Sequence, residues 1–331
     1  PDSNEPAYRW NWDSPLIISP HKTDRLYFAA NYLFQSDDRG NSWKKISDDL
    51  TRNEDRNKKK VMGKIWSVDA IFKNVFTSPL GTIVSLDESR IKEGVIVVGT
   101  DDGLVQVTKD NGVSWKKFEN FPGIPSRAYV TDVVASKHDV NTIYVTFNYH
   151  KYGDYKPYII KTSDGGDSWK MISSNLPKNN FVWSVVEDHI NSNILFVGTE
   201  FGMFYSINGG ANWNKFKDVP TIAIRDLEIH EGEDDLVAAS FGRGFYIVDD
   251  YSPIREVSQD FLSKDAHFFS VKDALQFVIA SPEKSATGHN FFTSPNPPYG
   301  VKLSYYLKDG LISKEEKRQK EEKSKFNRNE S

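Results

Sequence analysis

Four acidic residues lie in predicted loops, where two carboxyl groups could act together on a substrate: Asp101, Asp102, Asp154 and Glu200. Hydrolysis of a glycosidic bond needs two carboxyl groups roughly 5–10 Å apart, one of them with a raised pKa. Any two of these four residues are therefore candidates for the acid/base pair. The alternative is structural, because Asp101 and Asp102 precede Gly103 and Asp-Gly pairs favour tight turns.

A second group of residues has the chemistry of a binding surface. Aromatic rings stack on sugar faces or anchor peptides. The candidate ligand-binding residues are Tyr32, Arg127, Tyr149, His150, Tyr155, Trp183, Phe201 and Arg243. The alternative for the rings is packing in the core. We expect about half of the following aromatic residues to be buried in the core: Tyr32, Tyr149, Tyr152, Tyr155, Trp183 and Phe201.

Arginine and histidine residues raise two further kinds of site. Arg127, Arg225 and Arg243 could together clamp a carboxylate, because a guanidinium presents a matching fork of donors. The alternative is that each arginine pairs with a nearby Asp or Glu. His150 has no second histidine at metal-ligand spacing, since His138 lies twelve residues away in a different loop. We therefore expect neither a metal nor a cofactor.

A unit that occurs four times must position these candidates. Each copy has eight residues: a hydroxyl residue first, Asp or Asn third, Gly fifth, Ser or Asn seventh and Trp eighth, with any residue between them. The copies span residues 36–43, 108–115, 162–169 and 206–213. The Asp or Asn side chain can close a turn, the Gly tolerates a positive φ, and the Trp can bury a large ring. The structural residues of the four copies are Asp38, Trp43, Asp110, Trp115, Asp164, Trp169, Asn208 and Trp213.

The spacing of the copies predicts the fold. Successive tryptophans of the pattern are 72, 54 and 44 residues apart, and the shortest interval fits one four-stranded blade of a β-propeller. Apolar and β-branched runs precede each copy, as expected for strands. We predict an all-β propeller with about five readable blades, and the sequence leaves open whether five blades close a ring.

A propeller places the candidates on one face. The loops between second and third strands share that face with the loops that join blades, whereas the repeated turns lie at the opposite edge. The segment Asn148–Tyr155 lengthens one of these connections and is rich in aromatic residues. Because long loops in compact domains are usually functional, we expect it to pack over the mouth of the channel near Trp183 and Glu200.

The repeated pattern resembles the Asp-box, or BNR repeat, of sialidases, sortilin-type receptors and xyloglucan hydrolases. Further segments resemble large bacterial secreted proteins, usually called glycosyl hydrolases, of the BNR-repeat or sortilin-like group: residues 99–103, 198–202, 240–244 and 303–308. The resemblance covers nearly the whole chain. It implies an extracellular or periplasmic protein that binds a glycan or peptide on its loop face. The hydrolase label of that group follows the repeat, and fold alone does not fix an activity.

The chain is predicted to have three parts. Residues 1–253 form the propeller blades and residues 254–300 a linker and closing segment. Residues 301–331 hold the first strand of a second β module and a charged tail that is either helical or disordered. Residues 8–12 are predicted as an outer strand of a neighbouring blade. The chain begins at Pro1 without a signal-like segment, so we expect it to be part of a larger polypeptide.

Composition excludes several classes of function. The net charge of −4 argues against a nucleic-acid-binding face, which needs a positive stripe. No apolar run reaches membrane-spanning length. The absence of cysteine excludes disulfides and thiol chemistry. We predict a binding protein for a glycan or peptide, with a glycoside hydrolase and a purely structural scaffold as the alternatives.

Overall fold

The computed structural model describes residues 7–67, 69–70, 80–258, 261, 263–274, 276, 278 and 299–328. The chain divides into two compact units, Pro1–Tyr251 and Ser252–Ser331. Each unit is described by itself below.

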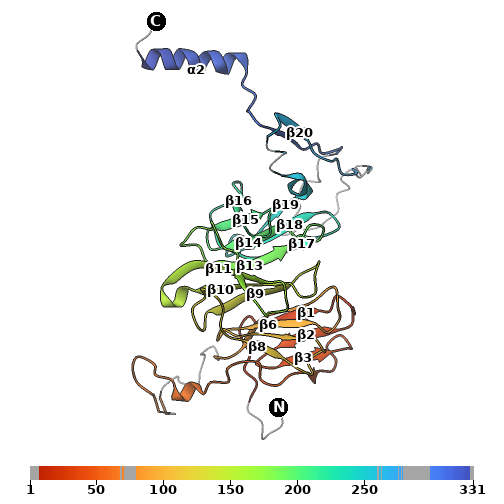
Figure 1. Ribbon diagram of the computed structural model, residues 1–331, viewed down its shortest axis with the longest axis vertical. Coiled ribbons are helices and arrows are strands. Elements are labelled where there is room, and N and C mark those ends of the chain that lie inside the picture. Colours follow the sequence, from red (N-terminus) through yellow and green to blue (C-terminus); the bar gives the residue numbers. More distant parts are fainter. Residues whose placement is uncertain are drawn as a thin grey trace, which may run out of the picture. The chain divides into compact units, whose positions relative to one another are not determined.

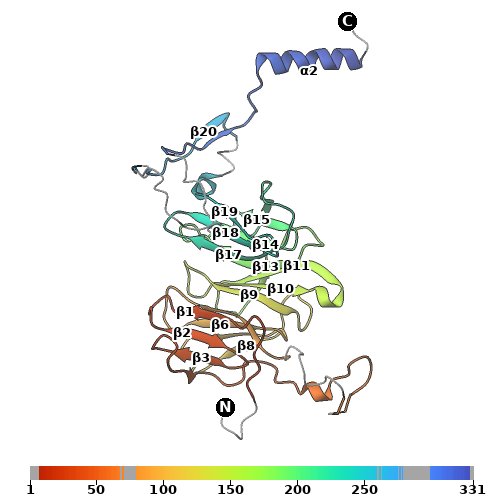
Figure 2. The same cartoon turned by 180° about the vertical axis from the view of Figure 1, so that it is seen from behind.

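The first unit is a β-propeller of five antiparallel sheets, which follow one another in sequence order from red to cyan in Figures 1 and 2. In every sheet each strand pairs with the next strand along the chain. Four sheets have four strands and the fifth has three. The predicted all-β propeller is therefore confirmed.

The strand bounds follow the predicted apolar runs. The first sheet contains β1 (Leu16–Ile18), β2 (Leu26–Ala29), β3 (Leu33–Ser36) and β4 (Lys44–Lys45), and the second contains β5 (Ile83–Glu88), β6 (Ile96–Thr100), β7 (Val105–Thr108) and β8 (Lys116–Phe118). The third contains β9 (Tyr129–Ala135), β10 (Ile143–Tyr149), β11 (Asp154–Thr162) and β12 (Lys170–Met171). The fourth contains β13 (Val182–Glu187), β14 (Leu195–Thr199), β15 (Gly202–Ser206) and β16 (Asn214–Lys215), and the fifth contains β17 (Ile224–His230), β18 (Asp235–Ser240) and β19 (Phe245–Val248).

The hydrophobic core lies between neighbouring sheets. Tyr27, Leu33, Ile83 and Ile96 are fully buried between the first and second sheets. Similar clusters fill the spaces between the second and third sheets and between the third and fourth. Burial of each large apolar side chain stabilises the fold by about 1.5–3 kcal/mol, so stability rests on the contacts between blades.

Two glycines let neighbouring sheets approach closely. They are Gly99 of β6 and Gly198 of β14. A Cβ atom on Gly99 would lie 2.3 Å from Cγ1 of Val130 in the next sheet, and one on Gly198 would lie 2.6 Å from the carbonyl oxygen of Ile224. A larger residue at either position would push two blades apart.

The four repeated turns share one hydrogen-bond pattern. In the copy at residues 162–169, Thr162 Oγ1 donates to Asp164 Oδ1 (2.7 Å) and accepts from the Gly166 amide (2.9 Å). The Ser168 amide donates to Asp164 Oδ1 and the Ser168 hydroxyl to Asp164 Oδ2. The copies at residues 36–43 and 108–115 repeat all four bonds, and the copy centred on Asn208 repeats three of them.

The tryptophans of these turns are less uniformly buried than predicted. Only Trp213 is buried, whereas Trp115 and Trp169 are half-buried and Trp43 is 40% exposed. Each of the last three copies packs against the preceding sheet; for example, the Trp213 indole donates to the carbonyl oxygen of Ile172 (2.7 Å). Trp43 belongs to the first sheet of the described residues, so none of them forms a preceding sheet to cover it. The prediction of four buried rings was therefore wrong for Trp43, and it was also wrong for Trp115 and Trp169, which their preceding sheets cover only in part.

The segment before β1 is not a strand, contrary to prediction. Tyr8 and Trp10 pack on the first sheet, with the Tyr8 ring 5.0 Å from Phe34 and the Trp10 ring 4.6 Å from Phe28 between centroids. The Arg9 amide donates to the side chain of Asn31 rather than to a strand (2.9 Å). Aromatic side chains hold this segment, and their spacing imitates a strand pattern.

The second unit contains few regular elements among its described residues. These are the 3-10 helix η3 (Ser252–Glu256), the strands β20 (Ala266–Phe268) and β21 (Tyr305–Leu307), which pair with each other, and the helix α2 (Lys314–Asn327). The strand predicted from residue 301 therefore begins later. All side chains of α2 are exposed, and Ser313 and Glu316 form a capping box at its start. The helix α2 covers residues 314–327 of the predicted charged tail.

Two predictions concern residues that are only partly described. Residues 279–298 of the predicted linker at residues 254–300 lie outside the described residues. In the described part of the chain, no helix combines the length and the apolar character needed to cross a bilayer.

Candidate functional site

A cavity of about 810 Å³ opens among the loops that join second to third strands. We call it the loop-face cavity. Its walls come from these loops, from the first residues of several inner strands and from the segment before β1. The lining residues are Asn11, Trp12, Asp13, Lys59, Leu80, Asp101, Asp102, Arg127, Tyr129, Asn148, Tyr149, His150, Lys151, Tyr152, Trp183 and Arg225.

The repeated turns lie at the opposite ends of the strands. The Gly165 amide donates to the carbonyl oxygen of Asn141, and the Gly209 amide donates to that of Asn193. Asn141 and Asn193 lie in the turns that join the first and second strands of the same sheets. Because the strands are antiparallel, the connections between second and third strands are at the other face.

The inner strand of four sheets contains a β-bulge, and at two of these bulges the unpaired residue lines the cavity. The ladder skips Val84 in β5, Thr131 in β9, Trp183 in β13 and Arg225 in β17. An unpaired residue at a bulge is re-aimed relative to the regular strand. Trp183 and Arg225 therefore occupy the same position in adjacent sheets and meet at the cavity wall.

Arg225 is held between two aromatic rings. Its guanidinium carbon lies 3.5 Å from the centroid of the Trp183 ring and 4.8 Å from that of Phe241. Within the described residues, none of its N–H groups has a hydrogen-bond or ion-pair acceptor. Burial lowers the pKa of Arg225, while nearby Glu200 and Asp13 act in the opposite direction. An arginine stays charged in proteins, so the cavity wall carries a positioned cation with free donors.

Further aromatic side chains lie next to Trp183. The Trp183 and Phe181 rings are 5.0 Å apart, and the His150 ring is stacked on Phe181 at 4.9 Å. Tyr149 and Tyr152 are stacked on each other at 4.4 Å with an interplanar angle of 16°. Tyr152 is 73% exposed, so this tyrosine pair presents a flat, accessible surface beside the cavity.

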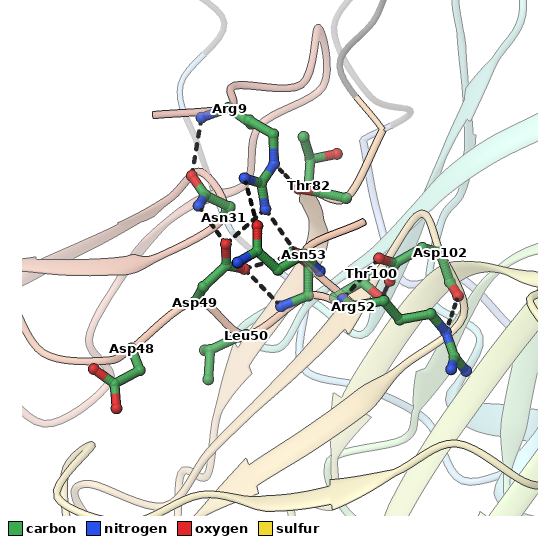
Figure 3. A network of polar contacts seen from close by, with 12 residues as sticks. Arg9, Asn31, Asp48, Asp49, Leu50, Arg52, Asn53, Thr82, Thr100 and Asp102 are labelled. Atoms are coloured by element: carbon green, nitrogen blue, oxygen red, sulfur yellow. Dashed lines mark hydrogen bonds and ion pairs between the residues drawn. The ribbon is translucent and has the colours of Figure 1, made fainter. Parts of the chain in front are cut away.

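Three carboxyl groups line the cavity, and two of them, Asp101 and Asp102, are engaged in the local fold. Asp101 accepts bonds from the amides of Gly81 and Thr82 and from the Thr82 hydroxyl. Burial raises the pKa of Asp101 to about 6. Asp102 accepts from the Thr100 hydroxyl (2.6 Å) and from the Arg52 amide (2.9 Å), as Figure 3 shows. Both residues stand in the turn between β6 and β7, as the structural alternative expects.

The other two predicted carboxylates do not line the cavity. Asp154 accepts from the Tyr158 hydroxyl (2.7 Å) and from the Lys156 amide (3.1 Å). Burial opposes the effect of these bonds, which lower the pKa of Asp154. Glu200 accepts from the Trp183 indole (2.9 Å). Glu200 is half-buried, and this bond helps to orient Trp183.

The structure brings half of the predicted site residues together. Those that line the cavity are Asp101, Asp102, Arg127, Tyr149, His150 and Trp183. Those that do not are Tyr32, Asp154, Tyr155, Glu200, Phe201 and Arg243. The three arginines do not form a clamp: Arg127 pairs with Glu54, and Arg243 is exposed away from the cavity.

The expectation that about half of the aromatic set is core was wrong. Tyr32, Tyr149 and Trp183 are half-buried, and Tyr152, Tyr155 and Phe201 are exposed. β-branched and aliphatic strand residues already fill the space between blades. Tyr149 packs against the core from the end of β10, and Arg225 of the next sheet covers Trp183, so these two rings are partly covered rather than buried.

Sequence reasoning missed several residues of the cavity wall. Arg225 was considered only as part of a three-arginine clamp. The available signal was its position, because Ile224-Arg225-Asp226 and Val182-Trp183-Ser184 occupy the same place in their repeats. Tyr129 at the start of β9, Lys151 in the loop and Asp13 before β1 carried no signal beyond their location. In the described part of the chain, no three His, Asp or Glu side chains are grouped in a way that could hold a metal.

Comparisons with known proteins locate the fold. No family model and no curated protein matches the chain. Among solved structures, an ancestral GH74 enzyme superposes with a TM-score of 0.52 at 15% identity, over 70% of this chain and 28% of that one. The GH74 xyloglucanase from Xanthomonas campestris has a TM-score of 0.52 at 16% identity, over 75% of this chain and 37% of that one.

A third structure matches over a larger part of its own length. The β-propeller domain of Cps50 (Swd1) from Myceliophteria thermophila has a TM-score of 0.52 at 12% identity, over 76% of this chain and 70% of that one. At these identities the likeness shows the propeller fold alone. The chain spans about a third of the length of the two GH74 structures.

Proposed function

We propose that this propeller binds a glycan in the loop-face cavity without hydrolysing it. The observation that carries the proposal is the contrast within the cavity wall. The Tyr152 ring is exposed and the guanidinium of Arg225 has no acceptor among the described residues, whereas Asp101 and Asp102 already accept bonds from the fold itself. A wall of this kind offers stacking and donors to a ligand but no free pair of carboxylates.

A glycan suits this wall better than a peptide. Strand addition and the docking of helical or proline-rich peptides need a free strand edge or an apolar groove. Leu80 is the one aliphatic side chain among the lining residues. The rest are aromatic, amide, charged or imidazole groups, which match the ring faces and hydroxyls of sugars. The resemblance to secreted bacterial proteins supports an extracellular or periplasmic location for such a ligand.

The test is calorimetric titration of the protein with a panel of neutral and acidic oligosaccharides. Replacing both Tyr149 and Tyr152 by Ala should weaken binding by about 1–3 kcal/mol, the range for truncating an aromatic anchor. The matched control replaces Trp43, which is exposed on the turn edge, by Ala. Equal loss in both variants, or binding of no oligosaccharide, would contradict the proposal.

One observation favours glycoside hydrolysis as a second candidate. The raised pKa of Asp101, about 6, is of the kind that a general acid needs. Release of reducing sugar from the bound oligosaccharides tests this function. If hydrolysis occurs and Asp101→Asn abolishes it while binding persists, the hydrolase is correct and the pure binding protein is wrong.

A further inference from the structure

The strongest unassigned feature of the cavity is a set of hydrogen-bond donors without acceptors. The guanidinium of Arg225 has no hydrogen-bond acceptor among the described residues, although two aromatic rings fix its orientation. The hydroxyl of Tyr129 and the ammonium of Lys151 also have no hydrogen-bond acceptor in the described part of the chain. Lys151 Nζ lies 5.6 Å from the centroid of the Tyr129 ring. All three side chains line the same cavity.

Arg225 and Lys151 are exposed and Tyr129 is half-buried, so the donors of these side chains are open to a ligand that enters the cavity. A guanidinium stacked on aromatic rings keeps its N–H edge available and loses little side-chain freedom on binding. That edge matches the two oxygens of a carboxylate in a bidentate pair. Arg127 cannot serve in the same way, because Glu54 already holds it in an ion pair.

We propose that the glycan bound in the loop-face cavity is acidic, and that Arg225 binds the carboxylate of a uronic-acid residue. This inference rests on the proposed glycan binding. Tyr129 and Lys151 supply the neighbouring donors, and the tyrosine pair at Tyr149 and Tyr152 supplies a stacking surface for an adjoining sugar. A carboxylate is preferred to a sulfate, because the planar fork of Arg225 matches a planar anion.

Two protein carboxylates bear on this assignment. Asp13 and Glu200 both interact electrostatically with Arg225, although neither forms an ion pair with it. Glu200 is bound to the Trp183 indole, which holds it in place. Asp13 is exposed and lines the cavity, so it repels an incoming anion. Asp13→Asn should therefore raise affinity for an acidic glycan and leave affinity for a neutral one unchanged.

The experiment uses the whole chain and oligosaccharides of galacturonate, glucuronate and alginate type. Each acidic oligosaccharide is compared with its methyl ester, which keeps the sugar ring but removes the charge. Sulfated dextran serves as a polyanion without carboxylates. The variants are Arg225→Lys, Arg225→Ala and Asp13→Asn, with Arg243→Ala as the control for an exposed arginine outside the cavity.

We expect at least one acidic oligosaccharide to bind about tenfold or more tightly than its ester. Arg225→Ala and Arg225→Lys should both erase this preference, because hydrogen bonds between charged groups account for about ten- to a hundredfold in affinity. Their affinity for the ester should fall by less than their affinity for the acid, because the ester has no charge to pair with Arg225. Melting temperatures of the variants identify any that fold poorly, and Asp13→Asn tests the charge effect with Arg225 intact.

The outcomes separate this inference from the proposed function. If the ester binds as tightly as the acid, or if the preference survives in both Arg225 variants, the carboxylate assignment is wrong while glycan binding stands. If sulfated dextran binds with the same dependence on Arg225, the site recognises negative charge in general and the assignment is also wrong. If no oligosaccharide binds, both proposals fail.

Discussion

The turn edge and the loop face of this propeller are built from opposite ends of the same strands. At the turn edge, Asp38 and Asp110 each accept bonds from a neighbouring hydroxyl and amide, which lower the pKa of both carboxyls to about 2. At the loop face, burial raises the pKa of Asp101 to about 6, and Arg225 has no acceptor among the described residues. The same arrangement of turn residues occurs four times at the turn edge, whereas the side chains of the loop face differ from blade to blade.

This difference indicates which side of the molecule is constrained by folding and which by a ligand. The repeated bonds of the turn residues are explained by stability alone, although the buried indole nitrogens of Trp115 and Trp169 have no hydrogen-bond partner among the described residues. The exposed donors and rings of the loop face add nothing to this repeated pattern and are open to a ligand. Substitutions at the two sides should therefore separate into effects on stability and effects on binding.

The largest expected loss of stability comes from adding a single methyl group at the turn edge. Gly166 has φ of +93°, and a Cβ there would lie 2.2 Å from the Phe118 ring of the preceding sheet. Gly166→Ala should lower the free energy of unfolding by about 3 kcal/mol, from overpacking and backbone strain together. Urea denaturation measures the change.

Gly153 on the loop face is the matched control for Gly166. It has φ of +78°, but no atom lies within 4 Å of its added Cβ. Gly153→Ala should cost about 1 kcal/mol, from strain alone. Equal costs at the two glycines would show that contact between blades does not explain the turn edge.

The next effect is the pH dependence caused by Asp101. Its pKa in the folded protein, about 6, is above the ordinary value of 3.8. Its contribution to stability is thus fully present below pH 4 and is lost as the pH rises through 6. The rise of about 2 units corresponds to a loss of up to about 3 kcal/mol.

Asp101→Asn isolates this contribution, because Asn keeps the shape and stays neutral. Wild-type stability relative to the variant should fall between pH 4 and pH 7 in denaturant titrations. The carboxyls of Asp38 and Asp110 behave in the reverse sense, and their stabilisation is lost as the pH falls from about 4 to 2. A difference between Asp101→Asn and wild type that does not change with pH would contradict the raised pKa.

A smaller effect is expected from one hydroxyl of a repeated turn. Thr162→Val leaves the buried amide of Gly166 without its acceptor and should cost about 1–2 kcal/mol. Thr162→Ser is the control, because Ser36 and Ser206 occupy this position in two other copies. If both variants are as stable as wild type, the hydroxyl does not hold the turn.

The smallest effect on stability is expected at the loop face. Tyr152 is 73% exposed, so Tyr152→Ala should change the free energy of unfolding by less than about 0.5 kcal/mol. Its effect on glycan affinity should be larger than its effect on stability. A loss of several degrees in melting temperature would show that the tyrosine pair is structural.

The sequence predicted those parts of the fold that depend on local chemistry. The repeated turn was recognisable because Thr162, Asp164, Gly166 and Ser168 bond within one short segment. Burial of the tryptophans was not predictable in the same way, because it depends on whether a preceding sheet exists. Trp43 and Trp213 have the same local sequence pattern but different neighbours.

The candidate site was predictable only in part for a similar reason. Asp101 and Trp183 were placed on the loop face by their position between or before strands. The stacking of Arg225 on Trp183 depends on bulges in two adjacent sheets, and a bulge leaves no clear pattern in a single sequence. The segment before β1 contributes Asp13 through aromatic packing that imitates a strand pattern.

The most direct test of glycan binding at the loop face is amide hydrogen exchange with and without a bound oligosaccharide. We expect added protection at residues 101–102, 148–152 and 182–183 and at the start of β17, with none at the repeated turn of residues 162–169. Protection confined to the repeated turns, or no change at the loop face under saturating ligand, would contradict the account.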